Sequence, residues 1–201
     1  MESRCATRIL LLTLLLAAAS TPVLAQERIL SFDSVINIAT DGSMTVAETI
    51  RVRAEGNAIR RGIFKDFPTR YQDRLGNRVT VDFEVLGVER DGQIEPWFTE
   101  RQSNGVRVYA GDANTFLAPG NYSYTIRYRT NRQLGFFDGH DELYWNVTGT
   151  GWEFAIESAT ARVMLPTNVP AASITMEGYT GPYGAAGQDY LSRVFDGGAT
   201  I

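Results

Sequence analysis

Glu48 is the residue whose type and position together raise the first question about chemistry. It lies at a core-facing position of residues 44–52, where apolar side chains otherwise alternate with other residues. An ionised carboxylate buried there costs several kcal/mol unless it is paired and hydrogen-bonded. We therefore expect a cation to meet Glu48, and the nearest candidates along the chain are Lys65, Arg60 and Arg61.

Three roles are open to Glu48. A buried ion pair would fix the register of its strand, and we favour this structural role, with Lys65 as the second structural candidate. A β-bulge that turns the carboxylate to solvent is the alternative. A ligand-binding or catalytic role is the third, and the sequence places no second carboxylate to support it.

The segment around His140 is the only one that resembles a set of metal ligands. Asp138, His140, Asp141 and Glu142 lie close together in the sequence, and a hard cation such as Ca²⁺ prefers several oxygen ligands from one loop. The spacing is not that of a calcium-binding loop, however, and a single histidine cannot build a histidine-based zinc site. We interpret the segment as a solvated acidic loop, and we predict no metal site and no cofactor.

Aromatic side chains suggest another class of function, the binding of sugars. Trp97 and Phe98 follow Pro96, which confines their strand to a sheet edge or a bulge because proline cannot donate to the ladder. These two residues are the weak ligand-binding candidates of the sequence. Trp145 belongs to an alternating apolar run over residues 143–147 and is expected in the core.

Catalytic constellations are not recognisable in the sequence. The nucleophile elbow Gly-x-Ser-x-Gly is absent, and the only histidine lies in the acidic loop. A glycosidase needs two carboxylates about 5 to 9.5 Å apart, and the sequence singles out no such pair among its 23 acidic residues. We therefore assign no catalytic residue and expect the protein not to be an enzyme.

Alternation with a period of two dominates the chain and indicates half-buried strands. It covers residues 30–38, with Leu30 and Phe32 on the core face, and then residues 44–52, 79–85, 122–128, 143–147 and 159–165. Turn-forming pairs such as Asp41-Gly42 and Asp91-Gly92 separate these runs. The pattern predicts an all-β fold, an antiparallel β-sandwich of the jelly-roll or immunoglobulin-like kind, with few or no helices beyond the N-terminal segment.

Residues 1–25 have the three parts of a secretory signal peptide. Arg4 and Arg8 give the charged start, residues 9–19 are apolar, and small residues lead to a cleavage point after Ala25. The apolar run is about half the roughly 20 residues that a membrane-spanning helix needs, and an uncleaved anchor is the alternative. Cleavage would also remove Cys5, the only cysteine, and leave no disulfide or thiolate site.

The rest of the chain divides into two parts. Residues 26–170 are expected to form the exported β-sandwich domain, and residues 171–201 a continuation rich in Gly, Ala and Tyr. The sequence stops without a charged tail, and we expect the natural chain to continue beyond Ile201, a frayed terminus being the alternative. The chain has 19 basic and 23 acidic residues, which argues against a nucleic-acid partner because such proteins carry a basic surface.

Three segments carry a resemblance to a known family. They are residues 41–50, residues 61–68 (Arg-Gly-Ile-Phe-Lys-Asp-Phe-Pro) and residues 142–149 (Glu-Leu-Tyr-Trp-Asn-Val-Thr-Gly), followed by Trp152 and a strand over 156–166. In this order the chain resembles the bacterial membrane proteins grouped as domain of unknown function 2207, over about residues 29–183. Lys65 stands where the resemblance leads us to expect arginine, so a cation is kept but a bidentate pair is lost.

The resemblance implies architecture more than activity: a signal peptide, an exported β-rich region and then transmembrane helices, with no assigned reaction and no agreed catalytic residues. We expect an exported, non-catalytic domain of a membrane-anchored protein at the extracytoplasmic face of the cell membrane, periplasmic or cell-surface. It would be an interaction or scaffolding module whose partner is an unknown protein or envelope component, with contact to the membrane through segments beyond this chain. An envelope glycan-binding or glycan-processing domain is the alternative.

Overall fold

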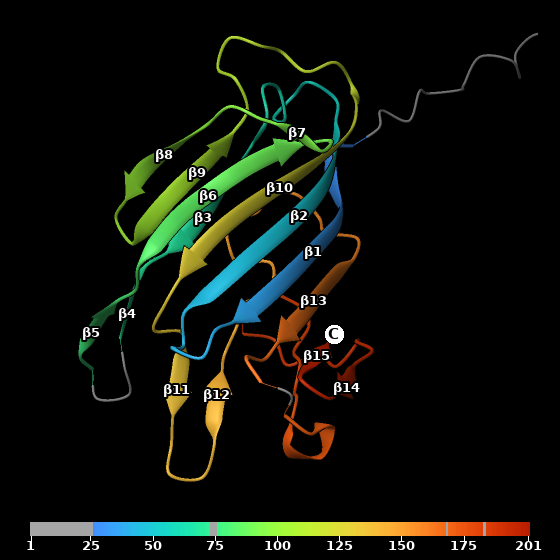
Figure 1. Ribbon diagram of the computed structural model, residues 1–201. Coiled ribbons are helices and arrows are strands. Elements are labelled where there is room, and N and C mark those ends of the chain that lie inside the picture. Colours follow the sequence, from blue (N-terminus) through green and yellow to red (C-terminus); the bar gives the residue numbers. More distant parts are fainter. Residues whose placement is uncertain (1–25, 73–75, 168, 183) are drawn as a thin grey trace, which may run out of the picture.

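Two layers of β-strands face one another across a hydrophobic core (Figure 1). The computed structural model describes residues 26–72, 76–167, 169–182 and 184–201, so the predicted signal peptide lies outside the described residues. The predicted all-β fold is confirmed, and the one helical element of the described chain is the 3-10 turn Ala171–Ser173. In these residues we find no helix of sufficient length and hydropathy to span a membrane.

The larger layer is a sheet of eight strands. Its members are β1 (Arg28–Ile38), β2 (Met44–Ala54), β6 (Phe83–Arg90), β7 (Gln93–Ile94), β10 (Gly120–Thr130), β13 (Ala159–Met164), β14 (Arg193–Phe195) and β15 (Gly198–Thr200). They lie in the order β14-β15-β13-β1-β2-β10-β6-β7. All neighbours are antiparallel except β1 and β13, which are parallel because the long connection after β10 returns the chain in the direction of β1. The sheet is therefore mixed, not wholly antiparallel as predicted.

The smaller layer consists of β3 (Ile63–Pro68), β9 (Gly105–Ala110) and β8 (Trp97–Gln102), with β9 in the middle. Close approach of β3 and β9 requires glycine where β3 begins, since a Cβ on Gly62 would lie 1.9 Å from the carbonyl oxygen of Ala110. Two hairpin ribbons extend from the sandwich, β4 (Arg70–Gln72) with β5 (Arg78–Thr80) and β11 (Leu134–Phe136) with β12 (Asp141–Leu143).

The core lies where alternate side chains of the two layers meet. The large sheet contributes Phe32, Ile36, Val46, Ile50, Tyr124 and Ile126, and the small sheet contributes Ile63, Phe67, Val108 and Ala110. Fully burying an aliphatic or aromatic side chain stabilises the fold by about 1.5–3 kcal/mol. The period-two pattern thus fixes which residue of each strand faces the opposite layer.

One predicted core residue is displaced by a local irregularity of β1. The register between β1 and β2 shifts between Ile29 and Ser31, so that Ile29 is fully buried and Leu30 only half-buried. A β-bulge adds one residue to one strand and reverses the parity on one side of it. The prediction that Leu30 faces the core is therefore wrong.

Two other predicted strands are shorter than expected. The run over residues 79–85 is divided between β5 and β6, because the backbone N–H of Asp82 donates to the side chain of Asn131 and leaves the ladder. The run over residues 143–147 ends as a strand at Leu143, and the chain continues as a loop toward the core.

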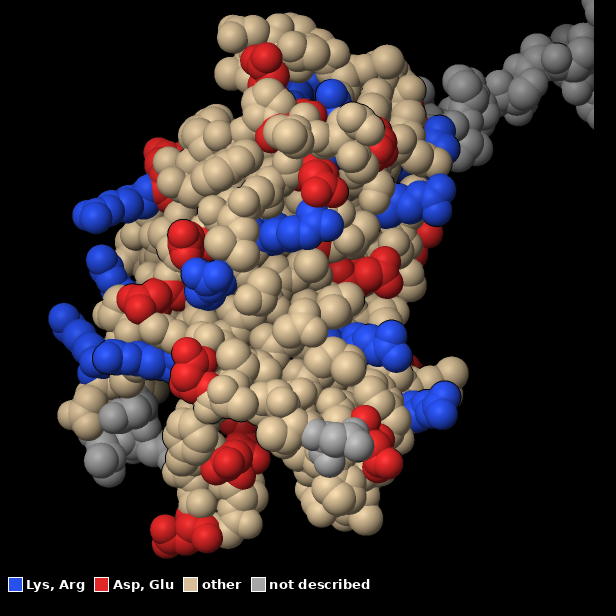
Figure 2. Space-filling model, viewed as in Figure 1, with Lys and Arg blue, Asp and Glu red and all other residues tan. Residues whose placement is uncertain are grey.

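The solvent face of the large sheet carries charges of both signs (Figure 2). Arg127 of β10 pairs with Glu89 of β6 at 2.6 Å, and Arg129 pairs with Glu84 at 3.4 Å. Such exposed pairs contribute at most about 1 kcal/mol each. Their mixture leaves this face without a continuous basic patch.

The Gly- and Ala-rich C-terminal segment supplies β14 and β15, which extend the large sheet beside β13. Ala161 and Ile201 exchange two backbone hydrogen bonds, of 2.9 and 3.0 Å. Residues on both sides of position 170 therefore share one sheet.

Candidate functional site

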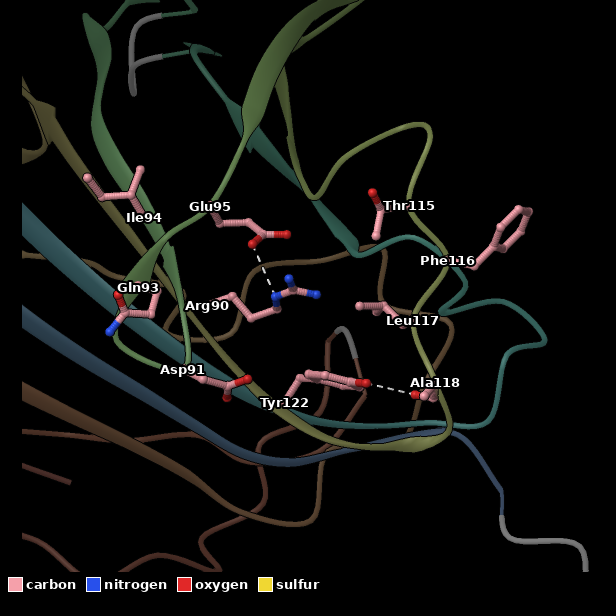
Figure 3. Close-up of a pocket in the computed structure, with 10 residues that line it drawn as sticks. All are labelled: Arg90, Asp91, Gln93, Ile94, Glu95, Thr115, Phe116, Leu117, Ala118 and Tyr122. Carbon is pink, nitrogen blue, oxygen red and sulfur yellow. Dashed lines mark hydrogen bonds and ion pairs between the residues drawn. The ribbon is translucent and has the colours of Figure 1, made fainter.

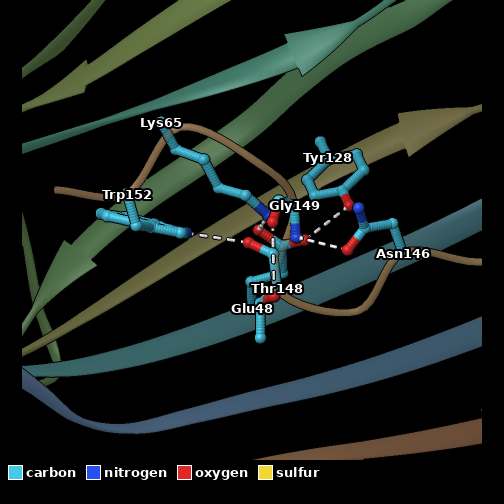
Figure 4. Close-up of polar contacts among 7 residues, drawn as sticks. All are labelled: Glu48, Lys65, Tyr128, Asn146, Thr148, Gly149 and Trp152. Carbon is cyan, nitrogen blue, oxygen red and sulfur yellow. Dashed lines mark hydrogen bonds and ion pairs between the residues drawn. The ribbon is translucent and has the colours of Figure 1, made fainter. Parts of the chain in front are cut away.

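A buried polar centre lies between the two layers. Glu48 projects from β2 and is 1% exposed. Its Oε2 forms an ion pair with the Nζ of Lys65, which comes from β3 in the opposite layer. Its Oε1 accepts a 2.9 Å hydrogen bond from the hydroxyl of Tyr128 on β10. One carboxylate thus connects three strands and both layers (Figure 4).

The ammonium group of Lys65 lies in aromatic surroundings. Its Nζ is 4.8 Å from the ring centre of Phe32 and 4.7 Å from that of Phe67, within the range of a cation–π interaction. Burial lowers the pKa of Lys65, and the Glu48 carboxylate acts in the opposite direction. Burial and the same carboxylate raise the pKa of Tyr128 well above its usual value, so the phenol stays a hydrogen-bond donor.

The loop after β12 closes this centre from outside (Figure 4). The Oδ1 of Asn146 accepts from the backbone N–H of Gly149 at 3.0 Å, and the indole Nε1 of Trp152 donates to the carbonyl of Thr148 at 2.8 Å. A Cβ on Gly149 would lie 3.2 Å from the Cε of Lys65, so the loop backbone rests on the lysine side chain. Lys65 is consequently 5% exposed, and the loop keeps ligands away from its amine.

The structure therefore brings Glu48 and Lys65 together, as the two structural candidates of the sequence. The alternative of a bulge at Glu48 does not occur, because its register with β1 and β10 runs on without a shift. The other two cations lie elsewhere, the guanidinium groups of Arg60 and Arg61 being 5.3 and 4.2 Å from the ring centre of Phe116.

Glu27 is another buried acid, and no sequence pattern singles it out. It is 8% exposed, and its two oxygens accept hydrogen bonds from the backbone N–H groups of Glu55, Asn57, Ala58 and Ile59. Burial opposes ionisation, but the four backbone donors together hold the pKa of Glu27 below its usual value. This carboxylate therefore fixes the turn that joins β2 to β3.

An open cleft of about 480 Å³ lies between the β6–β7 hairpin and residues 115–118 (Figure 3). Arg90 and Glu95 face each other in its middle, with 3.1 Å between Nε and Oε2. Glu95 is only 6% exposed, whereas Ile94 and Phe116, on opposite sides, are 91% and 58% exposed. The cleft thus combines a sheltered ion pair with apolar side chains at the surface.

A smaller hollow of about 130 Å³ adjoins the cleft, sharing Arg90 and Glu95 and adding Arg61 and Asp112. Burial raises the pKa of Glu95; Arg90 opposes this rise, and the carboxylates of Asp112 and Asp91 add to it. With Arg60 over Phe116, three guanidinium groups and three carboxylates therefore surround the cleft and the hollow.

Sequence reasoning missed this cleft. The Asp91-Gly92 turn was recognised, but no pattern connects it with residues 115–118, which only the fold brings near. The buried Tyr124 lies beside the cleft, and burial raises the pKa of its hydroxyl to about 12. That hydroxyl forms no hydrogen bond of normal geometry within the described residues.

Trp97 and Phe98, the ligand-binding candidates of the sequence, lie on the edge strand β8 but on opposite faces. Phe98 stacks on Tyr109 of β9 at a centroid distance of 4.5 Å. Trp97, which is 40% exposed, pairs with the buried Ala110 of β9 and therefore lies on the inner face of β8. Neighbours on a strand point to opposite sides. The two rings therefore cannot form one stacking platform for a sugar.

The acidic loop forms the tip of the β11–β12 hairpin. His140 stacks on Phe137 at 5.0 Å, and its Nε2 is 3.5 Å from an oxygen of Glu142. Over the part of the chain that the structure describes, no three His, Cys, Asp or Glu side chains converge as metal ligands.

Two solved structures show a distant likeness. Native yeast LTA4 hydrolase aligns with a TM-score of 0.47 and 14% identity over 87% of this chain and 28% of its own. The M1 zinc metallopeptidase from Deinococcus radiodurans aligns with a TM-score of 0.43 and 17% identity over 87% of this chain and 38% of its own. Scores below 0.5 at such identities transfer neither activity nor site residues.

Sequence comparison is more informative. The uncharacterized protein YciQ of Escherichia coli K12 is 31% identical over 131 residues, which are 65% of this chain and 21% of that protein. The chain therefore matches about a fifth of the length of this curated relative. Residues 28–192 match the family described as the N-terminal domain of a predicted membrane protein, DUF2207, and this chain belongs to that family.

Proposed function

We propose that this chain is an exported, non-catalytic interaction domain of a membrane-anchored protein, and that its cleft receives a segment of a partner protein. The observation that carries the proposal is the sheltered pair of Arg90 and Glu95 between the exposed side chains of Ile94 and Phe116. Binding sites typically combine apolar walls with a few convergent polar groups.

The buried centre supports the non-catalytic part of the proposal. Perturbed pKa values mark either active sites or structural ion-pair networks. Here the amine of Lys65 is covered by the loop at Gly149, and both oxygens of Glu48 are engaged by Lys65 and Tyr128. These groups hold the two layers together, and the shifted pKa values in this centre follow from that structural role.

The lining of the cleft favours a partner segment that carries both charged and apolar side chains. Acidic and basic side chains occur in equal number around the cleft and its adjoining hollow: Asp91, Glu95, Asp112, Arg61, Arg90 and, over Phe116, Arg60. A charged side chain of the partner would pair there, and an apolar neighbour would pack on the exposed rim. A few residues near the centre of such contacts, most often Trp, Tyr and Arg, supply most of the affinity.

Export and membrane anchoring rest on two supports. Residues 1–25 have the composition of a signal peptide, and the family description is that of the N-terminal domain of a membrane protein. The glycan alternative gains no support from the geometry, because Trp97 and Phe98 point to opposite faces of β8.

Site-specific photo-crosslinking in cells tests the proposal. A photoreactive amino acid would replace Phe116 in the full-length protein in its own host, with Phe136, 71% exposed on the β11–β12 hairpin, as the matched control. We expect a discrete adduct with another extracytoplasmic protein from position 116 and none from position 136. The adduct should disappear when Ile94→Asp is added. Adducts from both positions, or from neither, would contradict the proposal.

A further inference from the structure

We propose that two copies of this chain associate through their β8 strands, edge to edge and antiparallel, about a two-fold axis at Thr99. The smaller layers of the two copies would then join into one six-stranded sheet. This interface lies apart from the cleft and does not depend on it.

The free edge of β8 is the first observation. Within the residues that the structure describes, β8 pairs only with β9, and its first five residues, 97–101, are all exposed. It lies at the outer margin of the smaller layer (Figure 1). An exposed edge of this length is a template for pairing with another strand unless something blocks it. β8 has neither a bulge nor an internal proline, and its two charged residues, Glu100 and Arg101, limit the registers in which it can pair.

The ladder with β9 shows which backbone groups are free. The carbonyl of Pro96 accepts from the N–H of Gly111 at 2.8 Å, and hydrogen-bonded positions alternate along an antiparallel pair. Residues 98 and 100 therefore bond to β9. The N–H and C=O groups of Trp97, Thr99 and Arg101 point to the open edge.

Pairing about Thr99 uses all of these groups. Thr99 lies opposite Thr99 of the second copy, and Trp97 lies opposite Arg101 on both sides of the axis. Each of these pairs exchanges two backbone hydrogen bonds. Phe98 then faces Glu100, and no like charges oppose each other.

Other registers are less favourable. An axis at Glu100 sets two carboxylates directly opposite, and an axis at Arg101 does the same with two guanidinium groups; like charges in these positions destabilise a strand pair. An axis at Phe98 leaves Arg101 beyond the end of the opposing strand. Charge and strand length therefore select Thr99.

The side chains on the inner face of β8 are complementary in this register. Trp97 makes no ring or cation contact, and Arg101 no ion pair or hydrogen bond, within the described residues of one copy. In the dimer the guanidinium group of Arg101 of each copy lies beside the indole of Trp97 of the other copy. Arginine over tryptophan is a favourable cation–π arrangement when the separation is within about 6 Å.

The interface is small, because one pair of six-residue strands buries less than a standard interface of about 1,600 Å². We therefore expect a dimer that dissociates on dilution. Confinement to a membrane would raise the effective concentration of the second copy and favour pairing.

Disulfide trapping tests both the contact and its register. In full-length chains carrying Cys5→Ser, one variant has Phe98→Cys and another Glu100→Cys. These positions face each other without a hydrogen bond, at a Cα separation of about 4.5 Å that a disulfide accepts. Mild oxidation of the mixture should give about ten times more cross-linked dimer than either variant alone, which corresponds to 1.4 kcal/mol.

A backbone variant supplies the control. Thr99→Pro removes the central outward N–H without touching the ladder to β9, so it should abolish trapping, whereas Thr99→Val should keep it. Sedimentation equilibrium of the unmodified chain should show a reversible monomer and dimer. A monomer at the highest soluble concentration would overturn the proposal, and so would equal trapping in mixed and single samples. A disulfide-trapped partner other than this chain would likewise overturn it.

Discussion

Two carboxylate–cation pairs in this molecule have similar chemistry and different surroundings. Glu48 and Lys65 lie between the layers with 1% and 5% of their side chains exposed, whereas Arg90, paired with Glu95 in the cleft, is 27% exposed. The first pair is completed by Tyr128 and covered by a loop. The second pair opens onto a cleft with room for a ligand.

The difference teaches that burial alone does not mark a functional site. A fully enclosed pair has no group left for a ligand, and its removal exposes the cost of a lone charge in the core. A pair at the floor of a cleft keeps donors and acceptors that a ligand can reach. We therefore assign a structural role to the first pair and a role in binding a partner to the second.

Truncation of the enclosed carboxylate should have the largest effect. Glu48→Ala leaves the Lys65 ammonium unpaired among aromatic rings, and we expect a loss of about 3–5 kcal/mol in the free energy of unfolding. Arg51→Ala, on the exposed side of the same strand, should stay within about 0.5 kcal/mol of wild type. Denaturant unfolding measures both variants. Equal, small losses would show that the centre does not hold the layers together.

Glu95→Ala sharpens the same comparison. Arg90 keeps contact with solvent when its partner is lost, and burial opposes ionisation of Glu95, so the change should cost at most about 1 kcal/mol at neutral pH, the upper end for accessible pairs. A loss as large as that of Glu48→Ala would remove the distinction between the two sites.

The loop over Lys65 offers a matched pair of glycine substitutions. Gly149 and Gly151 have φ angles of 74° and 94°, so alanine is strained at both, by about 1–3 kcal/mol. At Gly149 the new Cβ also lies 3.2 Å from Lys65, whereas at Gly151 it meets nothing within 4 Å. Thermal melts should show Gly149→Ala to be the less stable variant. The reverse order would mean that the loop does not rest on the lysine.

The pH dependence of stability should separate two glutamates by sign. The folded-state pKa of Glu27 is lowered from 4.5 and that of Glu95 is raised from 4.5. The stabilisation by Glu27 is therefore present above pH 4.5 and lost on acidification, while that by Glu95 is present below pH 4.5 and lost as the pH rises through its folded pKa.

Denaturant melts of Glu27→Gln and Glu95→Gln across pH 3 to 7 measure these two contributions, since each amide cannot titrate. The wild-type advantage over Glu27→Gln should grow with pH, and its advantage over Glu95→Gln should shrink. Parallel curves for the two variants would contradict the environments described for these carboxylates.

Much of the fold could be predicted from alternation alone. The long strands β1, β2 and β10 follow directly from their period of two, and Glu48 could be placed in the core because it shares the parity of Val46 and Ile50. Lys65 was one of three cations that could pair with Glu48, and only the packing of β3 against β2 in the folded protein selects it.

The strands of the smaller layer were harder to recognise. β3 carries a buried lysine at a core position, and β9 is short and bounded by glycines, so neither shows a clean apolar alternation. The cleft depends on contacts between residues far apart in sequence, which no local pattern encodes. The parallel pairing of β13 likewise results from the path of a long connection.

One measurement tests the central claim most directly: photo-crosslinking from position 116 in two double variants, each also assayed for folding by its thermal melt. Arg90→Met with Glu95→Gln should keep a melting temperature near wild type and lose the adduct. Lys65→Met with Glu48→Gln should melt earlier but, at temperatures where it is folded, keep the adduct. Loss of the adduct from the folded core variant, together with its retention by the cleft variant, would contradict the assignment of structure to one pair and recognition to the other.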